Sequence, residues 1–167
     1  MPSTSSQGFS FPELMVTLAI LVIFATTAVP AMSAFIDQQR ASAYVRQFSQ
    51  HLAYARVAAT SSNLPVRVCP MADGACSDQW HSAPVQLTLQ YPDASTQLLK
   101  ELPSVSTAHK LKFNRDAITF RRDGSLNGFE NGTFIYCGKE DAKWHYTLTV
   151  NQAGRNRLNK IASPCPE

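Results

Sequence analysis

The sequence predicts an α+β fold in which one long N-terminal α-helix packs on an antiparallel β-sheet domain. Three observations support this prediction. An uncharged apolar run of 23 residues, Leu14–Ile36, lies near the start of the chain. A segment with helical periodicity follows it as far as residue 62. Beyond that point apolar residues recur with a period of two, in short runs bounded by Gly, Pro, Asn or Asp, as is typical of antiparallel strands.

The junction in front of the apolar run contains two informative residues, Gly8 and Glu13. Glu13 stands at the head of the run, where a carboxylate is unfavourable in a bilayer unless it has a partner. A secretory signal peptide carries its small-residue cleavage site after the apolar stretch, whereas Gly8 precedes it. Cleavage after Gly8 would therefore leave the apolar segment in the mature protein, with Phe9 as its N-terminus.

The apolar run and the segment after it predict one helix of about 50 residues. The first half is long enough to span a bilayer, because about 20 apolar residues suffice. The second half is amphipathic, and Pro65 lies just beyond its expected end. Its apolar residues recur at steps of three and four: Ala41, Val45, Phe48, Leu52, Ala55 and Ala59.

The remainder of the chain predicts short antiparallel strands joined by turns. Asp123-Gly124 and Asn131-Gly132 are turn signals. The segments with a period of two are Val66–Val68, Val85–Tyr91, Lys110–Phe113, Ile118–Phe120, Phe134–Cys137 and Trp144–Val150, and Arg155–Ile161 could pair back as a further strand.

The junction resembles the prepilin signal of type IV pilins and type II secretion pseudopilins, and an ordinary signal-anchor helix is the alternative. Gly8, Phe9 and Glu13 carry the resemblance. It implies that a prepilin peptidase cleaves after Gly8, that Phe9 is then N-methylated, and that Glu13 pairs with the N-terminal amine of a neighbouring subunit during assembly. It also implies a single-pass inner-membrane protein with its globular domain in the periplasm, which later enters an extracellular pilus.

These features divide the chain into four expected segments. Residues 1–8 are the leader, residues 9–36 the transmembrane and assembly half of the helix, and residues 37–62 its amphipathic half. Residues 63–167 form the globular β-rich domain.

The four cysteines, Cys69, Cys76, Cys137 and Cys165, lack the C-x-x-C spacing of zinc sites. Disulfides are the expected state in a membrane-anchored chain exported from the cytoplasm, and four free thiols are the alternative. Three pairings are possible. We expect Cys69–Cys76, which closes a short Gly-containing loop, and Cys137–Cys165, which pins the C-terminal tail.

The charge of the chain is concentrated in its second half. The net charge is +3 and the pI about 8.7, which is less basic than an obvious nucleic-acid-binding domain. Residues 1–99 contain four Lys or Arg and five Asp or Glu, whereas residues 100–167 contain eleven and seven. We interpret most of these later cations as solvated, internally balanced turns, Arg121-Arg122-Asp123 among them.

The best local candidate for a binding site is Gly154-Arg155-Asn156-Arg157. If a strand begins here, Arg155 and Arg157 point to the same face, because successive side chains alternate. Two guanidinium groups on one face of a hairpin tip can each bind a phosphate in a bidentate manner. Gly154 would supply the turn, Asn156 a contact to sugar or base, and Lys160 a nearby charge. An ordinary solvated strand edge is the alternative.

The whole chain resembles the GspH/FimT group of minor pilins and pseudopilins. The matching segments are the Gly8–Glu13 signal, Tyr54-Ala55-Arg56, Phe120-Arg121-Arg122-Asp123-Gly124 and Gln152-Ala153-Gly154-Arg155. FimT-type members are similar at a C-terminal G-R-x-R motif, which Gly154, Arg155 and Arg157 match. The resemblance implies a type IV pilin-like fold and a minor pilin that joins other major and minor pilins. It further implies binding of extracellular double-stranded DNA, without sequence specificity, in natural transformation.

Two other functions fit the same fold. One is a FimU-like minor pilin that primes pilus assembly without binding DNA, and the other is a GspH-like type II secretion pseudopilin. An enzyme is not expected, because the histidines are scattered and no catalytic signature is present. No metal site, phosphate-binding loop or cofactor is predicted.

Overall fold

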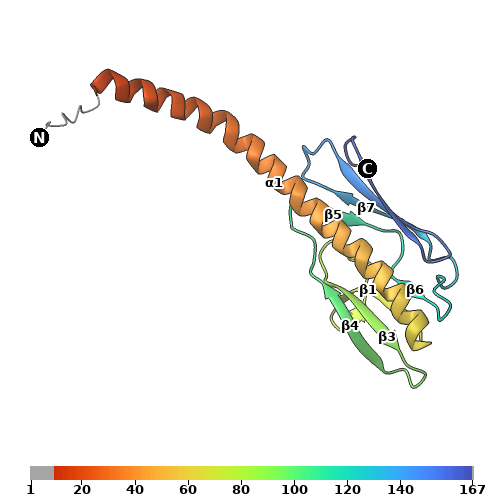
Figure 1. Cartoon of the computed structure of the whole chain (residues 1–167). Coiled ribbons are helices and arrows are strands. Elements are labelled where there is room, and N and C mark those ends of the chain that lie inside the picture. The colour runs from red at the N-terminus through yellow and green to blue at the C-terminus, as the bar shows by residue number, and fades with distance from the viewer. Residues whose placement is uncertain (1–9, 167) are drawn as a thin grey trace, which may run out of the picture. The chain divides into compact units, whose positions relative to one another are not determined.

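The computed structural model describes residues 10–166, so Gly8 and Phe9 lie outside the described residues. In that range the chain forms one helix followed by nine strands (Figure 1). Their bounds are α1 Phe11–Ser62, β1 Val66–Ala72, β2 Ala75–Cys76, β3 Val85–Gln90, β4 Thr96–Leu102, β5 Lys110–Lys112, β6 Ile118–Phe120, β7 Gly132–Cys137, β8 His145–Val150 and β9 Asn156–Ile161.

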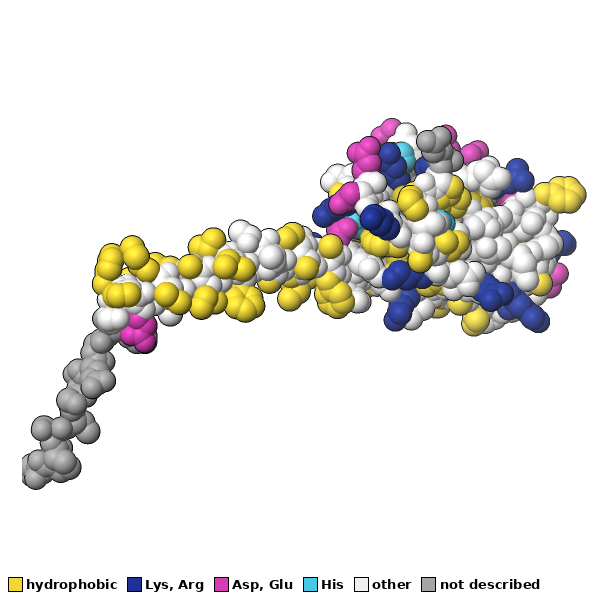
Figure 2. Space-filling view, turned by 90° about the horizontal axis from the view of Figure 1, so that it is seen from above, with side chains coloured by type: hydrophobic (Ala, Val, Ile, Leu, Met, Phe, Trp, Pro, Cys, Tyr) yellow, Lys and Arg dark blue, Asp and Glu magenta, His cyan; other side chains and the backbone are white. Residues whose placement is uncertain are grey.

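Helix α1 belongs to two compact units, residues 1–40 and residues 41–167. The helix of the first unit continues through Pro30 and carries many exposed apolar side chains, which are visible on the face shown in Figure 2. It is long and apolar enough to cross a membrane. This is the arrangement that the uncharged run predicts, because side chains that are apolar on every face require an apolar surrounding.

The second unit has its own hydrophobic core. The predicted stripe of α1, from Ala41 to Ala59, is buried, and it packs in one cluster with residues of both sheets. The fully buried residues of this cluster all lie between Ala41 and Val150. A fragment that begins at residue 37 therefore retains the whole core and both disulfides, as an independently folding domain should.

Two antiparallel sheets make up the rest of the unit. The first has the order β2-β1-β3-β4, with β6 also paired to β1, and the second has the order β5-β7-β8-β9. Aromatic rings fill the space between elements: the Phe48 ring of α1 lies 4.9 Å from that of Phe134 on β7, and the Trp80 ring lies 4.9 Å from Phe134. Trp80 precedes β3 and donates its indole N–H to the carbonyl oxygen of Arg115 at 2.6 Å, so its polar atom is satisfied in the core.

Strands β2 and β4 were not expected from the sequence. Strand β2 has only two residues, and β4 is an edge strand whose residues are mostly exposed on both faces, so it lacks a period of two. His145, the first residue of β8, is buried. The C-terminal tail covers this residue, because its Nδ1 lies 3.0 Å from the carbonyl oxygen of Ser163.

Both expected disulfides, Cys69–Cys76 and Cys137–Cys165, are present. The first closes the β1–β2 hairpin, where Met71 pairs with Cys76. The second joins the end of β7 to the tail that follows β9 and therefore holds the segment that covers His145.

Strands β8 and β9 form a hairpin whose tip is held by backbone bonds. Val150 pairs with Asn156, and the Asn151 N–H donates to the Arg155 carbonyl oxygen at 3.0 Å. The Asn151 side chain accepts from the Arg155 N–H at 2.9 Å, and the Gly154 N–H donates to the Asn151 carbonyl oxygen at 2.9 Å. Gly154 has φ +72°, the left-handed conformation that closes a three-residue hairpin loop.

A second turn, between β6 and residue 126, packs directly on this hairpin tip. A Cβ atom added to Gly154 would lie 2.0 Å from the carbonyl oxygen of Gly124. The Leu126 N–H donates to the Gln152 carbonyl oxygen at 2.9 Å, and the Gln152 side chain donates to the Leu126 carbonyl oxygen at 2.7 Å. Gly154 is therefore required both by its backbone conformation and by the close approach of Gly124.

We predict that Gly154→Ala destabilises the second unit by about 3 kcal/mol or more, because left-handed strain adds to a clash with a backbone oxygen. The matched control is Gly74→Ala, since Gly74 has φ +80° but nothing within 4 Å of an added Cβ. The free energy of unfolding of this control variant should fall by only about 1 to 2 kcal/mol. Urea unfolding of fragment 37–167 measures both variants, and equal losses would contradict the steric argument.

The two disulfides should differ in their contribution to stability. Cys137–Cys165 closes a loop with a sequence separation of 28, and Cys69–Cys76 one of 7. The entropy of loop closure in the unfolded chain predicts that the disulfide of the longer loop adds about 3.5 kcal/mol to the free energy of unfolding, and that of the shorter loop about 2.5 kcal/mol. We therefore expect the Cys137→Ser/Cys165→Ser variant to unfold at lower urea concentration than Cys69→Ser/Cys76→Ser. The reverse order would mean that contacts of the β1–β2 hairpin outweigh the chain-entropy difference.

Candidate nucleic-acid interface

The two arginines of the predicted motif, Arg155 and Arg157, lie at the tip of the β8–β9 hairpin and are exposed. Arg157 pairs with Thr149, whose side chain is also exposed. The neighbouring pair, Leu148 and Leu158, faces the core, so Arg157 is on the outer face of the sheet. Arg155 precedes it by two residues and pairs with Asn151, which places it on the same face.

Hydroxyl groups rather than carboxylates adjoin this part of the outer face. Thr149 lies beside Thr133 of β7, and their Oγ1 atoms are 2.9 Å apart. No strand residue of β5, β7, β8 or β9 is acidic. Within residues 10–166 the guanidinium groups of Arg155 and Arg157 have no ion-pair partner, so their charge is directed to solvent.

Two other residues of the predicted site do not join this face. The Asn156 side chain is part-buried: its amide nitrogen donates to the Ser49 carbonyl oxygen at 2.7 Å, and its amide oxygen lies 3.3 Å from the Ser49 hydroxyl. It attaches β9 to α1 and is not directed toward a ligand. Lys160 pairs with the buried Tyr146 and therefore projects from the opposite face to Arg157. The candidate phosphate-binding site therefore consists of Arg155 and Arg157 and does not include the side chains of Asn156 and Lys160.

The structure adds Arg56, which the motif analysis did not assign to the site. Its Nε donates to the Gly124 carbonyl oxygen at 3.2 Å, and its Cδ would be 3.3 Å from a Cβ on Gly154. Arg56 and Arg155 line the same cavity of about 370 Å³, together with Ala53, Val57, Gly154 and Asn156. The sequence shows that Arg56 lies off the apolar stripe of α1, but this position does not reveal which residues Arg56 contacts.

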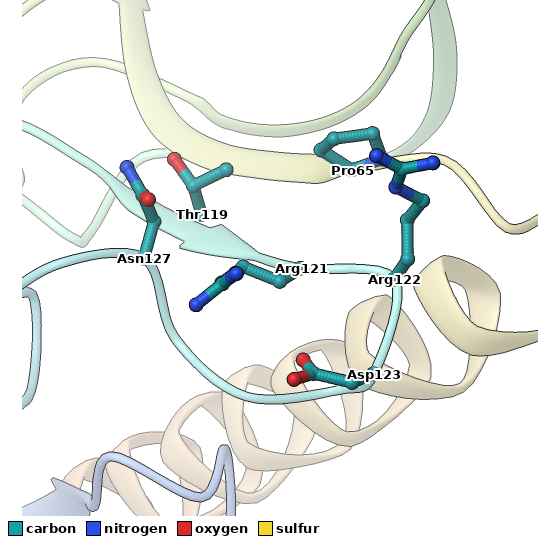
Figure 3. A pocket seen from close by; sticks show the side chains of 6 residues that line it. All are labelled: Pro65, Thr119, Arg121, Arg122, Asp123 and Asn127. Atoms are coloured by element: carbon teal, nitrogen blue, oxygen red, sulfur yellow. The ribbon is translucent and has the colours of Figure 1, made fainter.

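The turn after β6 carries a second group of cations, Arg121 and Arg122. They line a cavity of about 400 Å³ with Pro65, Thr119, Asp123 and Asn127 (Figure 3). The Arg122 side chain extends toward Pro65, whereas Arg121 extends into the space between Asn127 and Asp123. Neither arginine has an ion-pair partner among the described residues.

The Asp123 carboxylate is held within its own turn. Its Oδ1 accepts from the Ser125 hydroxyl at 2.6 Å and from the Ser125 N–H at 2.9 Å. These bonds, and to a smaller extent the charge of Arg121, lower the pKa of Asp123. Asp123 therefore remains charged at neutral pH, but its lone pairs are used by the turn. The sequence predicted that the charges of this turn offset one another. In the structure the Asp123 carboxylate lies near Arg121 without forming a direct ion pair with it.

A row of Lys and Arg side chains lies along one side of the second unit in Figure 2, whereas Asp, Glu, Lys and Arg side chains are mixed along the opposite side. A row of cations with few acidic neighbours gives a positive field that a polyanion can use. Among the described residues there is no cluster of three or more His, Cys, Asp or Glu that could hold a metal ion.

A separate feature lies at the start of α1 in the first unit. The Ser10 carbonyl oxygen accepts from the Leu14 N–H at 3.1 Å, and the Glu13 Oε2 accepts from the Ser10 N–H at 3.4 Å. This is half of a capping box, in which an acidic residue three positions after the N-cap satisfies a free backbone N–H. The S-x-x-E spacing was available in the sequence but was not used to interpret Glu13.

Comparisons with known proteins agree with the fold. Residues 44–154 match the family described as Type II transport protein GspH, and residues 3–29 match the prokaryotic N-terminal methylation motif. Comparison with curated protein sequences gives no match.

The solved structures that resemble the chain include a minor pilin and a minor pseudopilin. The type IV minor pilin FimU of Pseudomonas aeruginosa has a TM-score of 0.61 and 21% identity, covering 80% of this chain and 97% of FimU. The minor pseudopilin EpsH from the Type 2 Secretion System of Vibrio cholerae has a TM-score of 0.54 and 15% identity, covering 71% of this chain and 95% of EpsH. At these identities the likeness concerns the fold. Because the GspH match covers well over half of the sequence, the chain belongs to the GspH family, and it has the type IV pilin-like fold of minor pilins and pseudopilins.

Proposed function

We propose that this protein is a minor type IV pilin that enters the pilus and binds extracellular double-stranded DNA for uptake in natural transformation. The observation that carries the proposal is the pair of exposed guanidinium groups, Arg155 and Arg157, on one face of a rigid hairpin tip. The backbone of the tip is held by the bonds of Asn151 and Gly154, which keeps the attachment points of the two arginine side chains in place.

The chemistry of this face suits phosphate groups. Each guanidinium can donate two parallel hydrogen bonds to one phosphate, and the adjoining threonine hydroxyls are neutral donors. Contacts to phosphates carry no sequence information, so the binding is expected to be independent of sequence. It should also weaken strongly with salt, because each neutralised phosphate releases counterions.

The remaining steps of the proposal follow from family membership and the described helix. A prepilin peptidase cleaves after Gly8, and Phe9 becomes the methylated N-terminus. The apolar half of α1 then holds the subunit in the inner membrane, with its globular unit in the periplasm, until it joins other major and minor pilins. Glu13 would pair with the N-terminal amine of a neighbour at that stage.

The principal test is DNA binding by fragment 37–167. We expect micromolar binding to a fluorescent duplex at 50 mM salt, and loss of that binding in Arg155→Ala/Arg157→Ala. The matched control is Lys139→Ala/Lys143→Ala, which removes the same charge from the β7–β8 connection, at the other end of β8. Fluorescence anisotropy at 50 and 200 mM salt measures the binding, and the wild-type affinity should fall with salt with a logarithmic slope of about 0.9 per phosphate contact.

The outcomes separate the three candidate functions. A wild-type fragment that does not bind duplex DNA contradicts the proposal and leaves the FimU-like priming role or the GspH-like secretion role. Loss of pili on deletion of the gene would favour priming, whereas a protein used for DNA uptake should lose transformation while pili persist. Equal losses in the arginine and lysine variants would show that binding depends on net charge rather than on the hairpin tip.

The assembly role of Glu13 can be separated from its capping role. Glu13→Gln retains an acceptor for the Ser10 N–H but removes the charge, whereas Glu13→Ala removes both. If the carboxylate pairs with an N-terminal amine, both variants should enter pili several-fold less than wild type, measured by immunoblot of sheared pili. Normal incorporation of Glu13→Gln alongside failure of Glu13→Ala would assign capping alone.

A further inference from the structure

We propose that the DNA-contacting surface extends beyond the hairpin tip, through Arg56, to Arg121 and Arg122, and so forms one continuous five-arginine phosphate-binding surface. This inference rests on the proposed function and specifies its footprint. These residues come from three separate parts of the sequence, which are α1, the turn after β6 and the β8–β9 hairpin.

The two turns that carry the arginines are in direct contact. Gly124 closes the turn that begins at Arg121, since its N–H donates to the Arg121 carbonyl oxygen at 2.8 Å. The same Gly124 meets the backbone of Gly154, which immediately precedes Arg155. The Cα atoms at the two ends of a turn lie within about 7 Å of each other, and consecutive Cα atoms are about 3.8 Å apart, so the Cα atoms of Arg121 and Arg155 lie within about 16 Å of each other.

Arg56 connects the two groups. Its aliphatic carbons adjoin Gly124 and Gly154, and its Nε is bonded to the Gly124 carbonyl oxygen. A guanidinium has five N–H donors, so four remain for a ligand. Arg56 and Arg155 line the same cavity. The contact between the two turns is thus covered by a cation, and the positive surface is not interrupted there.

The Arg121–Arg122 turn has the features of a phosphate site. Both side chains are exposed and have no ion-pair partner within the described part of the chain. Their cavity also contains Thr119 and Asn127, which supply polar side-chain groups beside the guanidiniums (Figure 3). Asp123 offsets one charge, but its Oδ1 is occupied by Ser125. The five arginines and Asp123 together leave a net charge of +4 on the surface.

The test uses the same fragment and duplex. Arg121→Ala/Arg122→Ala should weaken binding by about tenfold or more and reduce the salt slope by about 1 to 2, as expected for one or two phosphate contacts. Lys139→Ala/Lys143→Ala, with equal charge loss, should change Kd less than threefold. Circular dichroism and thermal unfolding check that each variant is folded.

A second variant guards against a folding artefact. Asp123→Asn keeps an oxygen acceptor for Ser125 but removes the negative charge, so it should tighten binding, a gain that misfolding cannot produce. Wild-type Kd and salt slope in Arg121→Ala/Arg122→Ala, with binding lost in Arg155→Ala/Arg157→Ala, would overturn the extended surface and leave the proposed function intact. Absence of wild-type binding would overturn both. Unchanged affinity in Asp123→Asn would also count against the extension.

Discussion

The globular unit depends on one shared packing surface, the apolar stripe of α1 between Ala41 and Ala59. Both β-sheets bury residues in the same cluster as this stripe, and neither sheet closes into a barrel. Phe48 shows the arrangement most clearly, since its ring contacts both Trp80, in the connection before β3, and Phe134 on β7. Small residues at Ala41, Ala55 and Ala59 are fully buried, which lets the sheets approach the helix backbone. The stripe thereby brings the turns of the two sheets to a common place.

The position of the arginines follows from backbone packing more than from their own side chains. Gly154 and Gly124 touch because neither has a side chain at the contact, and each has a positive φ. Arg56 then lies over the contact, with its side-chain carbons beside both glycines and its Nε bonded to the Gly124 carbonyl oxygen. A cluster built in this way keeps its geometry in the absence of a ligand, which lowers the entropy lost when a ligand binds.

Local periodicity was sufficient to predict the helix and most strands, and the two disulfides were predicted from the expected export of the chain and the positions of the cysteines. The end of α1 at Ser62 and the pairing of β8 with β9 also agree with the sequence. Strand β4 was missed because an exposed edge strand has no buried face to impose a period of two. The partnership of Asn156 with Ser49 and that of Gly124 with Gly154 could not be predicted, because they join segments 107 and 30 residues apart and depend on the packing of the whole core. Sequence reasoning therefore identified Arg155 and Arg157 but could not identify their neighbours.

The bond between Asn156 and Ser49 has a mechanical consequence. Arg155 and Arg157 flank Asn156, and the side chain of Asn156 is anchored to the backbone of α1. A load applied at either arginine would pass into the helix within one residue, without crossing the other strands of the sheet. Helix α1 is also the element that contains the apolar segment of the first unit. Part of the tension on a bound polymer would thus pass through the hydrogen bonds between Asn156 and Ser49 into the backbone of α1, which is covalently continuous with the apolar segment.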